Sequence, residues 1–180
     1  MGNHTKQTQK TKAKIKKALM ELVNEKDFEL ITNNDICKKA CIHRTTFKSY
    51  YGSIHDVLKD IKDDMFCEFD KNSDSKSIRC KYIDLLNLIK YYHKYFIVYF
   101  SDDIPVLMPA RIEEALHFAC ENHIIPNICY DIDKEYAVTM MRNGSKAAIH
   151  HWLKTGCNES PEELADYIIK FFGIPENIEF

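Results

Sequence analysis

The sequence predicts an all-α fold, and three observations lead to this prediction. Glycine and proline contribute 5 residues each to a chain of 180, fewer than the many turns of a sandwich or barrel require. Apolar residues make up 45 % of the chain, enough to bury a core. Their spacing of three and four residues is that of amphipathic helices rather than of strands. We therefore expect helices joined by short turns.

Three helices are predicted at the start of the chain. The first covers residues 8–24, with its apolar residues on one face. Thr32 can cap a second, short helix that ends near Ala40, because Asp35 stands three residues later as in a capping box. A tight turn leads into a third helix over residues 43–50, which Gly52 stops. Helices of these lengths joined by short turns have the proportions of a helix-turn-helix unit.

A fourth predicted helix carries an apolar face over residues 57–69 and ends at a polar segment, residues 71–76. This segment is the expected joint between two domains. We place the first domain at residues 8–68, with its helix-turn-helix motif at about residues 31–50, and the second at residues 76–180.

The second domain is also predicted to be helical. One long amphipathic helix of some six turns is expected over residues 78–97. Pro109 begins or kinks another helix, and residues 134–154 form the penultimate one. The last helix follows Ser160, with Pro161 at its first position, and ends at Gly173.

Charge divides the chain into two parts. Residues 1–62 hold 13 Lys and Arg against 7 Asp and Glu, a local charge of +6, which leaves 12 against 20, or −8, for residues 63–180. Six lysines precede the first acid, Glu21: Lys6, Lys10, Lys12, Lys14, Lys16 and Lys17. Such a cationic segment can neutralise DNA phosphates and release their counterions, although a solvated tail has the same composition.

Several classes of protein are not indicated. No apolar run is long enough to span a bilayer and the polar N-terminus has no signal-peptide pattern, so a soluble, cytoplasmic protein is expected. The seven cysteines lack zinc-finger and disulfide-framework spacings. His117 and Cys120, like Cys37 and Cys41, are spaced as metal ligands can be, but scattered thiols are more often buried as small apolar groups. Nucleophile, phosphate-loop and metalloprotease motifs are absent, so we expect no enzyme, metal or cofactor.

The segment ITNNDICKKACIHRTTFKSYYGSIHDVL, residues 31–58, resembles the DNA-binding domain of the TetR family of transcriptional regulators. The resemblance covers about residues 8–68 and rests on the following positions: Asp35, Ile36, Ala40, Ile42, Arg44, Thr46, Phe47, Tyr50 and Tyr51. Three positions depart from the family pattern. Lys48 replaces a tyrosine, Cys41 replaces a glycine, and Ile54 with His55 replaces a basic residue.

The resemblance implies that the third helix reads DNA, held by the apolar anchors Phe47 and Ile36. Arginine can pair with guanine acceptors, and threonine offers a hydroxyl to phosphate or a methyl to thymine. The predicted DNA-binding residues are Thr32, His43, Arg44, Thr45, Thr46, Lys48 and Tyr50, with Lys12 and Lys14 from the cationic segment.

The last two helices resemble those of small TetR-type regulators, where they form the dimer interface. The predicted interface residues are Met140, Met141, Gly144, Ala148, Trp152, Ile168 and Phe172. Small residues permit close helix approach and methionines offer adaptable apolar area. A monomeric core would use the same residues. The resemblance implies a homodimer, most often a repressor, whose two recognition helices read a palindromic operator.

A cluster of aromatic residues near the end of the expected long helix is the candidate effector site. The residues predicted to bind a small molecule are Tyr92, His93, Phe96 and Tyr99. An aromatic stripe at helical spacing is also typical of a plain core or interface, so both interpretations remain open. Two other hypotheses stand beside the regulator. One is a protein-binding coactivator or adaptor on this fold, and the other is a ligand-binding or enzymatic helical bundle.

Overall fold

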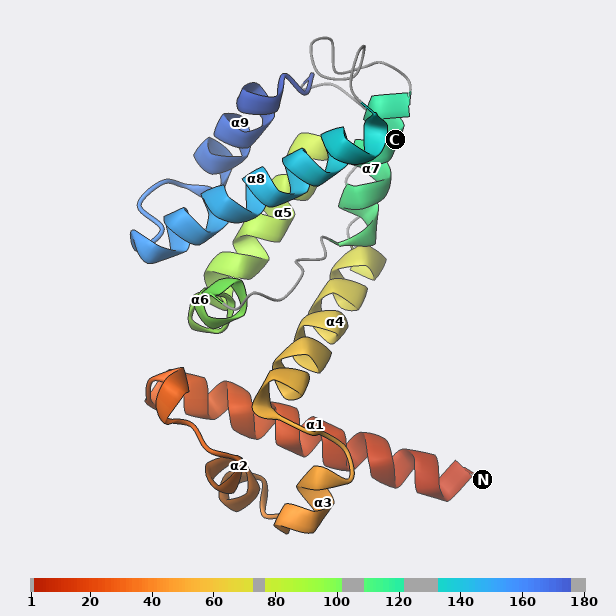
Figure 1. Ribbon diagram of the computed structural model, residues 1–180, viewed down its shortest axis with the longest axis vertical. Coiled ribbons are helices and arrows are strands. Elements are labelled where there is room, and N and C mark those ends of the chain that lie inside the picture. Colours follow the sequence, from red (N-terminus) through yellow and green to blue (C-terminus); the bar gives the residue numbers. More distant parts are fainter. Residues whose placement is uncertain (1, 73–76, 102–108, 122–132, 176–180) are drawn as a thin grey trace. The chain divides into compact units, whose positions relative to one another are not determined.

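The computed structural model describes residues 2–72, 77–101, 109–121 and 133–175, and every element in these ranges is a helix (Figure 1). The prediction of an all-α fold is confirmed. The chain forms two compact units, Met1–Met65 and Phe66–Phe180, and the division falls within one helix, α4 (Ile54–Asn72). None of the described helices is long and apolar enough to cross a membrane.

The first unit contains α1 (Gly2–Glu25), the 3-10 turn η1 (Phe28–Leu30), α2 (Asn33–Ala40), α3 (Arg44–Lys48) and the beginning of α4. Helix α2 packs against α1, and the short α3 packs against α2. The side chains that hold these helices together are at most 1 % exposed: Ile15, Leu19, Ile36, Phe47, Val57 and Leu58. The apolar periodicity of the sequence therefore marks the inward faces correctly.

Helix α2 begins at the capping box that the sequence predicts. The Thr32 hydroxyl accepts a hydrogen bond from the Asp35 amide at 3.2 Å, and the Thr32 amide donates to the Asp35 carboxylate at 2.9 Å. Lys26 adds an ion pair to Asp35 at 2.8 Å. The hydrogen bonds from Lys26 and then from Thr32 hold the pKa of the Asp35 carboxyl well below its usual range. Asp35 therefore joins the start of α2 to Lys26, the residue that follows α1.

The turn between α2 and α3 contains Cys41, the position at which the resemblance leads us to expect a glycine. Its backbone is left-handed, with φ 54°, a conformation that favours glycine. The Ile42 amide donates to the carbonyl of Cys37 at 3.0 Å and the Cys41 amide to that of Lys38 at 3.2 Å, so these two carbonyls near the end of α2 are satisfied. The turn therefore places a cysteine in a backbone conformation that strains residues other than glycine.

The second unit holds the end of α4 with α5 (Ile78–Tyr91), α6 (His93–Ser101), α7 (Ala110–Glu121), α8 (Lys134–Lys154) and α9 (Pro161–Phe172). The prediction of a single long helix over residues 78–97 is wrong. The helix ends before Tyr92, where φ is −104° and ψ is 34°, and a second helix begins at His93. Figure 1 shows α6 leaving in another direction from α5. Apolar spacing continued through the break, since both helices bury the same kinds of residue.

Two bidentate ion pairs connect helices of this unit that lie far apart in the sequence. Arg79 of α5 holds Asp166 of α9 at 2.6 and 3.0 Å, and Arg142 of α8 holds Glu113 of α7 at 2.6 and 2.8 Å. In the core of the unit, the hydroxyl of the fully buried Tyr82 is hydrogen-bonded to the Ser145 hydroxyl at 3.1 Å. These contacts orient the helices around the apolar core.

Candidate nucleic-acid interface and the groove between α8 and α9

Helix α3 presents polar side chains outward from a fixed anchor. Phe47 is 1 % exposed and packs toward Tyr51, with ring centroids 6.0 Å apart. The exposed residues around it are His43, Arg44, Thr45 and Lys48, while Thr46 and Tyr50 are half-buried. The structure thus brings the predicted residues of the third helix onto one accessible element. The helix covers Arg44–Lys48 and is therefore shorter than the predicted residues 43–50.

Thr32, also predicted to bind DNA, is exposed at the start of α2. Its hydroxyl donates to the Asp35 carboxylate at 2.7 Å and accepts from the Asp35 amide. The hydroxyl is therefore committed to the cap, so its local role in this structure is to begin α2.

Asn34 is a polar residue beside α3 that sequence reasoning missed. The Arg44 Nε donates a hydrogen bond to the Asn34 Oδ1 at 3.3 Å. Burial raises the pKa of the Cys37 thiol, and the charge of the nearby Arg44 acts in the opposite direction. No sequence motif marks this contact, because Asn34 and Arg44 lie on different helices.

The lysines of α1 fall into two sets. Lys14 is exposed, as are Lys6, Lys10 and Lys17. Lys12 instead forms an ion pair with Asp60 of α4 at 3.2 Å, and its Nζ lies 5.1 Å from the centroid of the Tyr51 ring. Lys12 and Lys14, both predicted to bind DNA, therefore lie in different environments: Lys12 is paired with Asp60, and Lys14 is exposed.

Asp60 is the centre of this contact between α1 and α4. Its carboxylate accepts from the Tyr51 hydroxyl and from Lys12, and Lys16 lies 3.7 Å away and also pairs with Asp64. Burial acts to raise the pKa of Asp60. The hydrogen bonds from Tyr51 and Lys12 and the charge of Lys16 together outweigh burial, so the pKa of Asp60 lies below its usual value. Lys12 and Lys16 fasten α4 to α1 within the first unit.

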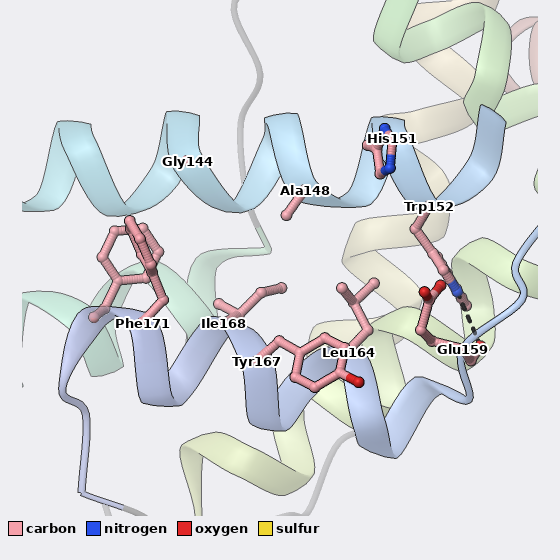
Figure 2. Close-up of a pocket in the computed structure, with 10 residues that line it drawn as sticks. Gly144, Ala148, His151, Trp152, Glu159, Leu164, Tyr167, Ile168 and Phe171 are labelled. Carbon is pink, nitrogen blue, oxygen red and sulfur yellow. Dashed lines mark hydrogen bonds between the residues drawn. The ribbon is translucent and has the colours of Figure 1, made fainter. Parts of the chain in front are cut away.

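An apolar groove of about 420 Å³ lies between α8 and α9. Figure 2 shows the side chains of α9 reaching toward α8, with Trp152 at the end near Glu159, where its Nε1 donates to the Glu159 carbonyl at 3.0 Å. The residues that line the groove are Gly144, Ala148, His151, Trp152, Glu159, Leu164, Tyr167, Ile168, Phe171 and Phe172.

Five of the seven predicted interface residues line this groove: Gly144, Ala148, Trp152, Ile168 and Phe172. Met140 is 56 % exposed on α8, whereas Met141 is fully buried in the core of the unit. Sequence reasoning missed the two most accessible aromatic residues on α9, Tyr167 at 58 % and Phe171 at 81 %. Their spacing of four residues places them on the same exposed face of α9 as Glu163 and Lys170, an unusual position for large aromatic residues.

Gly144 leaves room on α8 for the ring of Phe172 from α9. A Cβ atom at this position would lie 2.7 Å from the Cζ of Phe172. Any other residue at this position would force the Phe172 ring to move away from the backbone of α8.

The four predicted effector residues are divided between core and surface. Phe96 and Tyr99 are fully buried, and their rings pack with Tyr95 and Phe100 at centroid distances of 5.1 to 6.3 Å. Tyr92 is half-buried and His93 is exposed. In the described part of the chain, Phe96 and Tyr99 belong to a filled ring cluster. Across the same ranges, no three metal-ligating side chains gather.

The match to a known protein family lies in the second unit. A family model described as the C-terminal region of transcriptional regulators, of the TetR type, matches residues 82–173. No curated protein matches the chain.

Solved structures match nearly the whole chain. A TetR transcriptional regulator from Streptococcus agalactiae is 22 % identical with a TM-score of 0.65, covering 94 % of this chain and 97 % of that one. Thermus thermophilus FadR, a TetR-family repressor solved with lauroyl-CoA, is 18 % identical with a TM-score of 0.64, covering 89 % and 92 %. The dihydroxyacetone kinase operon activator DhaS is 21 % identical with a TM-score of 0.56, covering 90 % and 93 %. These similarities show the fold.

Proposed function

The chain belongs to the TetR family of transcriptional regulators, since the family model covers more than half of it, and on this premise we propose that it is a cytoplasmic repressor that binds a palindromic operator as a homodimer. The observation that carries the proposal is the outward-facing set of polar side chains on α3, held by the buried Phe47 in the positively charged part of the chain.

In this proposal α3 enters the major groove. Arg44 reads a guanine through its O6 and N7 acceptors, and Thr45 and Thr46 contact thymine methyl groups or phosphates. Lys48 binds phosphate as a mobile point charge in place of the family's tyrosine, with Tyr50 beside it. His43 precedes the helix, and Lys14 supplies a phosphate contact from α1.

The test begins with the selection of preferred duplexes from a random library by the purified full chain. We expect an inverted repeat whose half-sites are centred about 34 Å apart, one turn of the duplex. Arg44→Ala should lower discrimination between the selected and a scrambled duplex by roughly 10- to 100-fold, the effect of one bidentate base contact. Lys38→Ala is the matched control, because it removes an exposed positive charge on α2 that has no ion pair in the described structure. Equal losses on both duplexes for Arg44→Ala contradict base reading.

The groove between α8 and α9 supports the homodimer. Large apolar side chains that stay exposed on adjacent helices are typical of surfaces that meet a partner, and Tyr136, Met140, Tyr167 and Phe171 are each more than half exposed. A second copy related by a two-fold axis would cover the same residues on both chains. Two α3 helices are then available to one palindromic site.

Release by a small molecule completes the proposal. Its support is family membership and the lauroyl-CoA complex of the Thermus thermophilus neighbour. A ligand acts only through a difference in affinity between the two states of the protein, so it must bind the DNA-free state more tightly. Lauroyl-CoA, added to the preformed complex while fluorescence anisotropy is followed, is the first probe, and an unchanged anisotropy up to saturating concentration rules out this ligand.

A further inference from the structure

The geometry points to Asn34 as a positioning residue for Arg44: its carbonyl oxygen holds the guanidinium for base reading while its amide N–H groups face a DNA phosphate. This inference rests on the proposed DNA-binding function and deepens it. Nothing in the family resemblance selects Asn34, and the assignment comes from one contact between α2 and α3.

The chemistry of the two groups settles which way the amide lies. Arg44 Nε stands 3.3 Å from the Asn34 side-chain oxygen. A guanidinium carries only donors, so the atom that faces it must be the carbonyl oxygen rather than the amide nitrogen. The Asn34 Nδ2 therefore points away from Arg44, and it has no hydrogen-bond partner among the described residues. It offers two N–H donors beside the recognition helix.

The contact restricts Arg44 without using the atoms that read a base. Nε takes one of the five N–H donors, and the two Nη groups keep the other four, which can form two parallel bonds to the O6 and N7 of a guanine. An untethered guanidinium can turn to any nearby acceptor, phosphates included. Lys48, on the same helix, has no such partner within the described chain. Arg44 is thus the pre-oriented cation of α3.

Asn34 is itself held in place. It is the second residue of α2, inside the capping box of Thr32 and Asp35, and the neighbouring Asp35 is paired with Lys26, which directly follows α1. Ile36, two residues further along, is fully buried. The carbonyl oxygen therefore sits on a helix whose start is fixed to the rest of the unit, as a group that must aim another side chain requires.

The test is a double-mutant cycle on discrimination, the ratio of dissociation constants for the scrambled and the selected duplex. Asn34→Ala should lower discrimination by about 3- to 10-fold, Arg44→Ala by about 10- to 100-fold, and the double variant no further than Arg44→Ala. Asn33→Ala is the matched control, since Asn33 is the same residue type in the same turn and makes no side-chain hydrogen bond to any described residue. Thermal unfolding of each variant verifies that α2 remains folded.

A second variant separates the two roles. Asn34→Asp keeps an oxygen for Arg44 but removes the amide donors, so we expect discrimination near the wild-type value and a lower affinity for both duplexes. Replacing the contacted guanine by 7-deazaguanine, which lacks the N7 acceptor, should reduce wild-type binding more than binding by Asn34→Ala. Equal discrimination for Asn34→Ala and Asn33→Ala, or additive losses in the cycle, overturn the inference while Arg44→Ala still supports the proposed function. A wild-type chain that binds no duplex overturns the proposed function itself.

Discussion

Phe171 offers the most direct test of the homodimer. This side chain is 81 % exposed on α9 at the edge of the groove. An aromatic side chain can bury roughly 200 Å², so about 160 Å² of Phe171 remains available, equivalent to about 4 kcal/mol at about 25 cal/mol per Å². In a two-fold symmetric dimer both copies of the Phe171 ring are buried, so the total is about 8 kcal/mol. If association recovers about half of this total after the ordering of side chains, Phe171→Ser should weaken the dimer by about 4 kcal/mol, or about 1,000-fold in Kd.

The assay is sedimentation equilibrium of the full chain over a wide concentration range, with circular dichroism as a check on folding. Tyr91→Ser is the matched control, because Tyr91 is 76 % exposed on α5 and does not line the groove. Its dimer should dissociate as the wild type does. Because the Phe171→Ser chain would be monomeric, it should occupy a palindromic duplex only at protein concentrations high enough for two monomers to bind the two half-sites independently. A Phe171→Ser dimer of unchanged Kd, or an equal loss for Tyr91→Ser, refutes the assignment of this surface.

Two further predictions concern the first unit. Lys14→Ala should reduce the slope of log K against log salt by about 0.9 per protomer on any duplex, since Lys14 is exposed, whereas Lys12→Ala should mainly lower the melting temperature because Lys12 is paired with Asp60; a larger slope change for Lys12→Ala contradicts this division. The pKa of Asp35 is lowered in the folded chain by Lys26, so its contribution to stability is present above its ordinary pKa of about 3.9 and is lost as pH falls below it. Asp35→Asn should therefore melt at a lower temperature than the wild type at pH 7, with the difference shrinking toward pH 3; a constant difference between the two melting curves argues against the Asp35 ion pair.

Local sequence was sufficient to predict much of this fold. The cap at Thr32 and the start of α9 at Ser160 both appear as predicted, each with a reciprocal acid three residues on. Capping boxes and apolar faces involve residues within four positions of one another, so their energetics can be read from a short window. The break at Tyr92 escaped notice because apolar spacing does not record a change in helix direction.

The candidate sites were only partly accessible in this way. Helical spacing predicted the buried anchor Phe47, and the resemblance marked five of the ten residues that line the groove between α8 and α9, while the role of α3 in reading DNA stays a prediction. Residue types and helical spacing did not show that Lys12 forms an ion pair with Asp60, 48 residues away, and the prediction that Lys12 binds DNA stays untested. They also passed over Phe171, because its exposure depends on where α9 packs in the second unit.

The sequence by itself determined the all-α fold, the capping boxes at Thr32 and Ser160, the family and the polar residues of α3. Tertiary structure alone decided which lysine is engaged, that Asn34 meets Arg44 across 10 residues of chain, and which aromatic rings remain uncovered on α9. The physical reason is the range of the interactions. Helix formation depends on near neighbours, while ion pairs between helices and exposed apolar area depend on how separate helices pack.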